Sequence, residues 1–280
     1  MRSTKIIPLI SLISLLLPLS ALCQTVVKGR VISEDDSTPV AFASIGIKNR
    51  EAGCVADSSG NFVLELPAFV KQTDSLIISS IGYERSGYVV AKVKSTKEFR
   101  LKGAGQDLKA VIINSHFKEM KFGNAKDESF LFFRSWGAKG TAGEIGQVME
   151  IPHDSYMIKN IQIKIDNKYD TCWVRLHIRK VLDNNMPDAE LLKENIIKPI
   201  YATNSNDNIE FDLSGKDIEI NTKKIFVGFE VLDCRSKDEF SHSICFVGSE
   251  YGQHLFKPFA NSKWDVDGMF SIYIKMLLKY

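Results

Sequence analysis

Hydrophobic and polar residues alternate with a period of two along most of the chain after residue 24, and helical periodicity is rare there. In the first part of the chain, turn signals separate the alternating or apolar runs at intervals of about ten residues. These runs predict strands over residues 27–32, 43–47, 61–66, 76–80, 88–93 and 97–101. Short strands at this spacing are typical of a small β-sandwich.

The second part of the chain has longer alternating runs joined by longer connections. They predict strands over residues 161–165, 172–180, 209–213, 224–232, 243–248 and 269–278. Many antiparallel strands with long connections favour a jelly-roll-like sandwich. Residues 189–197, bounded by Pro187 and Pro199, are the one stretch with the character of a short helix. Glycines punctuate a segment that predicts a loop or hairpin: Gly137, Gly140, Gly143 and Gly146.

The break between the two parts lies near Asn114. Gly103 and Gly105 interrupt the first series, residues 108–114 form one more strand-like run, and residues 116–126 are polar without strong periodicity. The sequence therefore predicts an all-β chain of two sandwiches. The first sandwich covers residues 24–114, a linker covers 115–126, and the jelly-roll-like sandwich covers 127–280.

The first 23 residues resemble an export signal. Two basic residues within residues 1–5 precede an apolar run over 6–22 that Pro18 interrupts, which disfavours a membrane-spanning anchor. Cys23 allows lipid attachment after cleavage, but the bulky Leu22 fits poorly where a small residue is expected before the cut. We expect a cleaved signal peptide and an exported protein, whether periplasmic, associated with the outer membrane or secreted.

Composition and charge exclude several classes of protein. The chain has 280 residues, of which 44% are hydrophobic and 25% charged, as in folded soluble proteins rather than disordered ones. Its 36 basic and 34 acidic residues give a formal net charge of +2, and the signal segment holds two of the basic residues. The mature chain is thus balanced, without the global field that attracts nucleic acid. Peripheral contact with a membrane is compatible with this balance.

A series of short motifs stands in order along the first block. It comprises Gly29-Arg30-Val31, residues 38–45, Gly53, residues 57–62 and residues 77–83. This ordered set resembles the carboxypeptidase-regulatory-like domain of Gram-negative cell-envelope proteins, including TonB-dependent receptors. The resemblance implies a transthyretin-like or immunoglobulin-like sandwich over about residues 25–114. The family pattern usually has Thr next to the position of Cys54. The family's domain accompanies peptidases without being their catalytic unit, so the resemblance implies no peptidase activity.

Common catalytic motifs are missing from the sequence. There is no H-E-x-x-H, no G-x-S-x-G, no P-loop and no G-x-G-x-x-G, and the five histidines are isolated from one another: His116, His153, His177, His242 and His254. Residues 206–208 and 265–268 offer oxygen atoms but not a complete calcium loop, which favours turns. We therefore expect no metal or cofactor. Paired carboxylates for glycoside hydrolysis need only proximity in space, so that alternative stays open.

One predicted strand carries a candidate binding surface. Within residues 172–180, one face is apolar and the other displays Trp173, Arg175, His177 and Arg179. An aromatic ring beside two guanidinium groups and an imidazole can stack a sugar or hold a carboxylate. The alternative is a solvated face whose arginines pair with acids on the neighbouring strand. Trp136 and Trp264 lie near loop signals, where they either contact a ligand or close the edge of the core.

Four cysteines remain after cleavage: Cys54, Cys172, Cys234 and Cys245. An exported protein can form disulfides, and four cysteines allow three complete pairings. Cys234 ends one predicted strand and Cys245 lies in the next, so a hairpin would bring them together. The sequence predicts a Cys234–Cys245 disulfide and a buried, apolar Cys172.

These observations lead to one functional expectation and two alternatives. We expect an exported, non-enzymatic cell-envelope protein in which a β-sandwich adaptor accompanies a module that binds a glycan or a protein partner. The first alternative is an envelope or polysaccharide hydrolase with its site in the second block, and the second is a purely structural envelope protein. The sequence does not specify an oligomeric state.

Overall fold

The computed structural model describes residues 25–105, 117–123, 133–136, 142–204, 207–216, 218–236, 243–248 and 252–280. The predicted signal peptide and the predicted boundary near Asn114 lie outside these ranges. The described chain is nearly all β, with a four-residue helix, α1 (Val90–Val93), as the one helix among these residues. The predicted all-β class is confirmed. No helix in the described ranges combines the length and the apolar character that crossing a membrane requires.

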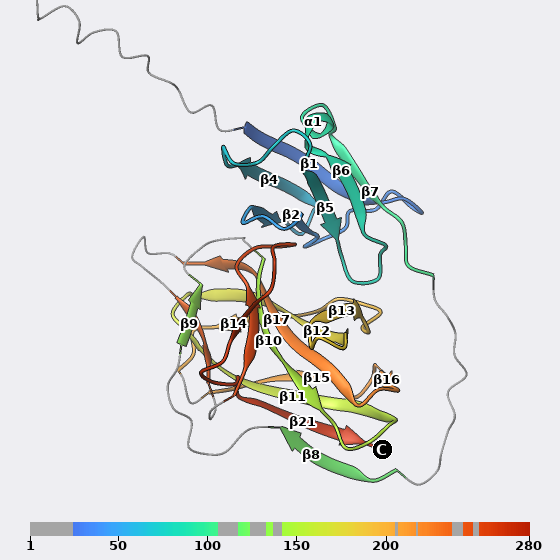
Figure 1. Cartoon of the computed structure of the whole chain (residues 1–280), viewed down its shortest axis with the longest axis vertical. Helices are drawn as coiled ribbons and strands as arrows, with labels where there is room; N and C mark the ends of the chain where they lie inside the picture. The colour runs from blue at the N-terminus through green and yellow to red at the C-terminus, as the bar shows by residue number, and fades with distance from the viewer. Residues whose placement is uncertain are drawn as a thin grey trace, which may run out of the picture.

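The N-terminal sandwich consists of a three-stranded and a four-stranded sheet (Figure 1). The first has the order β4 (Asn61–Leu66), β1 (Thr25–Ser33), β7 (Glu98–Leu101), and the second has the order β3 (Gly53–Val55), β2 (Ser44–Ile47), β5 (Ser75–Ser79), β6 (Ser86–Val89). Strand β4 shows why the sequence folds this way: Phe62, Leu64 and Leu66 are buried while the residues between them are exposed. The turn before β4 contains Gly60 at a φ of 77°, which glycine adopts without strain.

The C-terminal sandwich consists of two seven-stranded sheets. The β12 sheet has the order β13 (Pro187–Glu190), β12 (Thr171–Val181), β17 (Lys224–Arg235), β10 (Gly143–Glu150), β19 (His254–Lys257), β20 (Asp265–Asp267), with β14 (Ile196–Tyr201) also paired to β12. The β11 sheet has the order β8 (Glu119–Gly123), β21 (Ile274–Lys279), β11 (Tyr156–Asn167), β18 (Ile244–Val247), β9 (Phe133–Trp136), with β15 (Asn208–Asp212) and β16 (Glu219–Ile220) paired to β11. The chain crosses repeatedly between the two sheets, as in a jelly roll.

Each sandwich has its own hydrophobic core. The N-terminal core gathers side chains from residues 27–101, and the C-terminal core gathers side chains from residues 145–278 together with Ile81. Since Ile81 follows β5 of the N-terminal sandwich, its place in the other core shows that the two sandwiches are packed together.

Short-range contacts join the two sandwiches, with β2 and β5 nearest to the C-terminal sandwich (Figure 1). The Asn49 amide donates to the Asn261 carbonyl at 3.0 Å, and the Asn195 side chain donates to Ser80 Oγ at 3.1 Å. The backbones approach most closely at Gly46, where a Cβ atom would lie 1.9 Å from the carbonyl oxygen of Ala260. Only glycine fits at this point of contact.

Several predicted elements were wrong in detail. Residues 189–197 form no helix, because β13 and β14 take up both ends of this segment as strands paired with β12. The predicted linker contains β8, which pairs with β21. Gly143 and Gly146 lie within β10 rather than in a loop, whereas Gly137 and Gly140 fall outside the described residues.

Two shorter segments also differ from the prediction. The predicted strand over residues 88–93 ends at Val89 and continues as α1, whose Val90 and Val93 are buried. The predicted turn over residues 265–268 is largely strand β20, which pairs with β19.

The predicted Cys234–Cys245 disulfide is wrong. Cys234 is bonded to Cys172, and the two lie opposite each other on β17 and β12 with their Cα atoms 4.1 Å apart. Cys245 is a free, buried thiol on β18, in the other sheet of the sandwich. The chain passes from one sheet to the other between residues 234 and 245, so proximity in sequence does not become proximity in space. Cys172 is buried, as predicted, but it is not a free apolar residue.

Candidate functional site

A row of charged residues crosses the face of the β12 sheet that points away from the C-terminal core. In strand order, Arg175 on β12 lies opposite Glu230 on β17, which lies opposite Glu144 on β10 and then Lys257 on β19. Alternation explains the row, because the side chains that flank Arg175 and Glu230, and those of Ile145 and Phe256 beside the other two members, belong to the core or pack against it. The exposed fractions of Arg175, Glu230 and Glu144 are only 1%, 3% and 0%. Buried charges at this depth require partners.

A row of glycines beside the charges leaves space for large side chains. Gly228 on β17 lies opposite Gly146 on β10. A Cβ atom at either position would lie 2.4 Å from the ring of Phe226, which folds over both glycines. Arg179 lies against the same ring, with its Cζ 5.9 Å from the ring centroid, and reaches across to pair with Glu144. The glycines thus allow a cation on β12 to reach a carboxylate two strands away.

The N-terminal sandwich completes the bonding of the charged row. Arg175 Nη1 donates to Glu230 Oε2 at 3.0 Å and to Ser44 Oγ at 3.1 Å, and Ser44 Oγ donates to Glu230 Oε1 at 2.7 Å. Arg175 Nη2 donates to the carbonyl of Phe42. Both Phe42 and Ser44 belong to the N-terminal sandwich, so a buried ionic network spans the two sandwiches.

His177 lies between two carboxylates. Its Nδ1 is 2.6 Å from Glu190 Oε2, and its Nε2 is 2.9 Å from Glu230 Oε2. His177 Nδ1 also lies 2.9 Å from Arg179 Nη2, which can only donate, so Glu190 and Arg179 compete for this nitrogen. Carboxylates at both ring nitrogens nevertheless favour the imidazolium form, which can donate to each of them. Arg179 pairs with Glu190 through Nε at 3.3 Å and with Glu144 through Nη1, so every carboxylate of the network faces a cation.

The charges of the network shift its acid–base equilibria. Burial alone would raise the pKa of Glu230, but Arg175 and His177 outweigh it and lower this pKa to about 2. Burial likewise opposes the ionised form of Glu190 and Glu144, and neighbouring cations hold the pKa of both below the ordinary value. Burial and Arg179 disfavour the imidazolium of His177, yet Glu144 and Glu190 raise its pKa above the ordinary 6.5.

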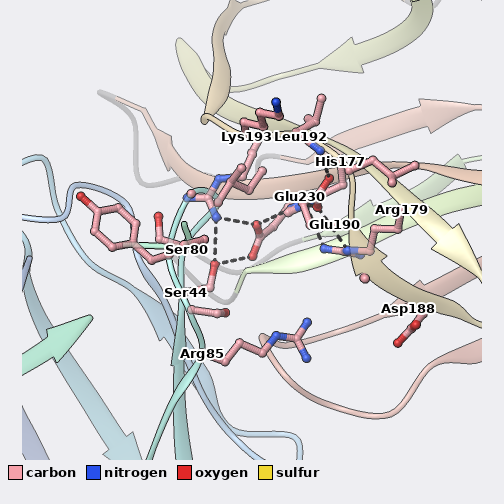
Figure 2. Close-up of a pocket in the computed structure, with 18 of the residues that line it drawn as sticks. Ser44, Ser80, Arg85, His177, Arg179, Asp188, Glu190, Leu192, Lys193 and Glu230 are labelled. Carbon is pink, nitrogen blue, oxygen red and sulfur yellow. Dashed lines mark hydrogen bonds and ion pairs between the residues drawn. The ribbon is translucent and has the colours of Figure 1, made fainter. Parts of the chain in front are cut away.

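A cavity of about 690 Å³ opens beside this network, between the two sandwiches (Figure 2). Arg175, His177, Glu190 and Glu230 line its floor. The N-terminal sandwich contributes the segments around residues 79–85 and 104–105, and the C-terminal sandwich contributes residues 188–193. The volume is within the range of natural small-molecule sites, and a cavity beside perturbed acids and bases is a candidate functional site.

Comparison with known families identifies the first sandwich. Residues 27–113 match the family model of the CarboxypepD_reg-like domain. The predicted resemblance is confirmed for this part of the chain. The CarboxypepD_reg-like domain therefore supplies Ser44 and the Phe42 carbonyl to the interdomain network.

Comparisons over the whole chain gave only distant likenesses. No curated protein matches the sequence. Two solved structures of infectious bursal disease virus, from the Gx and Gt strains, are each 8% identical and cover 91% of this chain, with TM-scores of 0.30 and 0.29. This chain spans 62% and 63% of those two chains. A third is a structure titled for the promiscuous specificity of carbohydrate-binding modules of the β-sandwich superfamily. It is 11% identical, covers 80% of this chain and 96% of its own, and has a TM-score of 0.22.

The predicted binding surface is divided by the structure. Arg175, His177 and Arg179 share one face and line the cavity, but all three are buried and in contact with acids, and Arg175 is also bonded to the CarboxypepD_reg-like domain. Trp173 does not line the cavity: it lies nearer the start of β12, where the guanidinium carbon of Arg235 lies 4.6 Å from the centroid of its ring. The alternative expectation was a solvated strand face whose arginines pair with acids on neighbouring strands. The structure has the ion pairs, but the arginines are buried rather than solvated.

The remaining candidates lie elsewhere. Trp264 packs edge-on against Phe226 at 5.1 Å and closes the side of the network, while the side chain of Trp136 lies outside the described residues. His153 stacks on Tyr280, His254 Nδ1 is bonded to the Phe270 carbonyl, and His116 and His242 are outside the described ranges. In the part of the chain that the structure describes, no three His, Cys, Asp or Glu side chains are placed to hold a metal ion.

The network predicts a specific dependence of stability on pH. Because the pKa of His177 is raised on folding, its imidazolium stabilises the folded state fully below pH 6.5, and this stabilisation is lost as the pH rises through the raised pKa. The carboxyl of Glu230 has the opposite pH dependence. Its ionised form stabilises the folded state above pH 4.5, and this stabilisation is lost as the pH falls towards about 2.

We therefore expect the urea midpoint of the mature chain to fall as the pH rises above 6.5 and through the raised pKa of His177. At pH values below 6.5, His177→Gln should have a lower urea midpoint than the unmodified chain. Above pH 6.5, its midpoint should decline less steeply. His153→Gln, outside the network, serves as the control. An alkaline decline that is equally steep in His177→Gln would contradict the assignment.

Proposed function

We propose that the chain is an exported, non-enzymatic cell-envelope protein that binds a ligand in the cavity between its two sandwiches. In this proposal the CarboxypepD_reg-like domain is the adaptor and the C-terminal sandwich is the binding module, with the division at residues 24–114 and 127–280. The observation that carries the proposal is the interdomain cavity with its buried ionic floor. Such a floor fixes the positions of polar groups before a ligand arrives, which reduces the cost of binding.

The ionisation of the cavity carboxylates favours binding over hydrolysis. A glycoside hydrolase needs one carboxylic acid that stays protonated near neutral pH, which usually means a raised pKa. The pKa of Glu230 is instead about 2, and that of Glu190 is also lowered. Both are paired with cations and therefore have no proton to donate to a leaving group.

Export is supported by the first 23 residues and by the disulfide. The segment has the basic start and short apolar run of a signal peptide. The bond between Cys172 and Cys234 is of the kind that persists in the periplasm or outside the cell rather than in the reducing cytosol. Both features support an envelope or secreted location.

A blocked cavity tests the proposal. Ala189 is exposed on β13 and lines the cavity, so Ala189→Trp should fill it without disturbing a core. Ala91→Trp, on an exposed position of α1, is the matched control. The mature chain would be titrated by calorimetry with a panel of neutral and acidic oligosaccharides, and each mixture would be analysed for cleavage products.

We expect at least one saccharide to bind the unmodified chain and Ala91→Trp intact, and to lose about tenfold or more in affinity with Ala189→Trp. Cleavage with turnover would favour the hydrolase instead. If no saccharide of the panel binds, or if Ala189→Trp binds normally, the cavity is not the site.

A further inference from the structure

The cavity has more positive than negative charge. Three carboxylates line it: Asp188, Glu190 and Glu230. Six permanently charged cations also line it: Arg85, Arg175, Arg179, Lys180, Lys193 and Lys257. Glu144 lies just outside the lining and pairs with Lys257 and Arg179, which still leaves two cations in excess. The whole chain has only two more basic than acidic residues, so an excess of this size in one cavity is a local feature.

The cations of the cavity fall into two groups with different roles. Arg175 and Arg179 of the floor are buried and bonded to carboxylate, hydroxyl and carbonyl groups of the protein, and Lys257 is paired with Glu144. Arg85, Lys180 and Lys193 are exposed at the rim, and no ion pair or hydrogen bond of their side chains is found among the described residues. The rim cations are thus free to meet an anionic ligand, while the floor is already neutralised.

The rim cations come from both sandwiches. Arg85 follows the bend after β5 of the CarboxypepD_reg-like domain, and Lys193 lies between β13 and β14 of the C-terminal sandwich. The two segments touch, because a Cβ at Gly82 would lie 2.8 Å from the Lys193 carbonyl oxygen. Figure 2 shows Arg85 and Lys193 on opposite sides of the ionic floor. An anionic ligand that spans the cavity would therefore touch both sandwiches.

The remaining lining is mixed, with serine hydroxyls beside the apolar side chains of Ile81, Leu191 and Leu192, and suits the hydroxyl groups and apolar faces of a sugar. Ser79 and Ser80 line the cavity, and Tyr83 is the one aromatic residue of its lining. Arg175 Nε is buried at the floor and has no hydrogen-bond partner within the described part of the chain, so one donor there is unused. Unused buried donors and hydroxyls favour a ligand with many oxygen atoms.

We propose that the cavity binds an acidic saccharide, with its carboxylates at the rim cations and its hydroxyls against the polar lining. This inference rests on the proposed function and narrows it to one class of ligand. Charged hydrogen bonds to a carboxylate are the stronger contacts in such a site, and the polar lining supplies orientation. Arg85 is the rim cation chosen for the test, because it is the one contributed by the CarboxypepD_reg-like domain and its side chain makes no ion pair or hydrogen bond among the described residues.

A matched pair of ligands tests the charge directly. Trigalacturonate and its fully methyl-esterified form have nearly the same shape, but only the former is charged. A hyaluronan tetrasaccharide provides a second acidic probe. Each would be titrated into the mature chain, into Arg85→Glu and into Lys92→Glu. Lys92 is exposed on α1, away from the cavity, and provides the same change of charge.

We expect at least one of the two acidic probes to bind. If trigalacturonate binds, its affinity should be about tenfold or more higher than that of its ester. Arg85→Glu should weaken the acidic probe by about tenfold or more, whereas Lys92→Glu should not. The inference is overturned if neither acidic probe binds. It is also overturned if trigalacturonate and its ester bind with equal affinity, or if Arg85→Glu binds the acidic probe as tightly as the unmodified chain does. If neutral saccharides still bind and Ala189→Trp abolishes that binding, the proposed function stands without the acidic ligand. If no saccharide binds, both proposals fail.

Discussion

Replacing Glu230 with alanine is expected to destabilise the mature chain by about 3–5 kcal/mol, the loss seen when one partner of a buried ion pair is removed. Glu230 accepts hydrogen bonds from Ser44 and Arg175 and faces His177 Nε2. Without it, the buried guanidinium of Arg175 loses its carboxylate, and the hydroxyl of Ser44 loses its acceptor across the interface. Urea unfolding followed by circular dichroism would measure the loss.

A double-mutant cycle separates the ion pair from simple loss of packing. The cycle uses Arg175→Met, Glu230→Leu and the variant with both changes, which removes both charges and keeps apolar volume. We expect the double variant to be clearly more stable than the summed losses of the two single variants predict. Glu210→Ala, at an exposed position of β15, is the control. A loss below about 1 kcal/mol for Glu230→Ala, as for a surface pair, would show that the network is solvated.

Gly46→Val is expected to separate the two sandwiches. The new Cβ would lie 1.9 Å from the carbonyl oxygen of Ala260, and that atom belongs to the backbone, so it cannot turn aside as a flexible side chain can. Relief requires the CarboxypepD_reg-like domain to move away, which would also break the contacts of Phe42 and Ser44 with Arg175. Overpacking alone costs about 1–3 kcal/mol, and the exposed network adds to this.

Scanning calorimetry would detect this separation. We expect one cooperative transition for the unmodified chain and two resolved transitions, at lower temperatures, for Gly46→Val. Gly87→Val is the matched control in the same sheet, because its Cβ would meet only the end of the Ile77 side chain, at 3.4 Å. If Gly46→Val unfolds like Gly87→Val, the close approach at Ala260 does not exist in solution.

The sequence predicted one half of the site because that half is periodic. Alternation over residues 172–180 placed Arg175, His177 and Arg179 together on one face, and the structure confirms this. Trp173 shares this face by the same alternation, but periodicity cannot reveal that the cavity does not extend along β12 as far as Trp173.

The other half of the site could not be found in this way. Glu144, Glu190 and Glu230 lie on three strands far apart in sequence, and strand pairing alone brings them together. Arg175 is bonded to Phe42 and Ser44 of the first sandwich, and no local pattern in the sequence encodes that contact. A polar row on a strand otherwise indicates a solvated face.

The fold shows the same division between local and distant information. Alternation predicted most strands and the all-β class, because burial on one face leaves a trace in every strand. The expected helix over residues 189–197 failed because pairing with β12 outweighed local preference. The expected disulfide failed because sequence neighbours were assigned to one hairpin, whereas the chain changes sheets between Cys234 and Cys245.

Both proposals depend on the docking of the two sandwiches, since the cavity and its ionic floor exist only between them. Small-angle X-ray scattering of the mature chain near pH 6 tests this docking most directly. We expect a scattering curve that matches the docked arrangement of Figure 1 and that does not change between low and moderate salt. A larger radius of gyration, with the curve of two sandwiches moving independently, would contradict it.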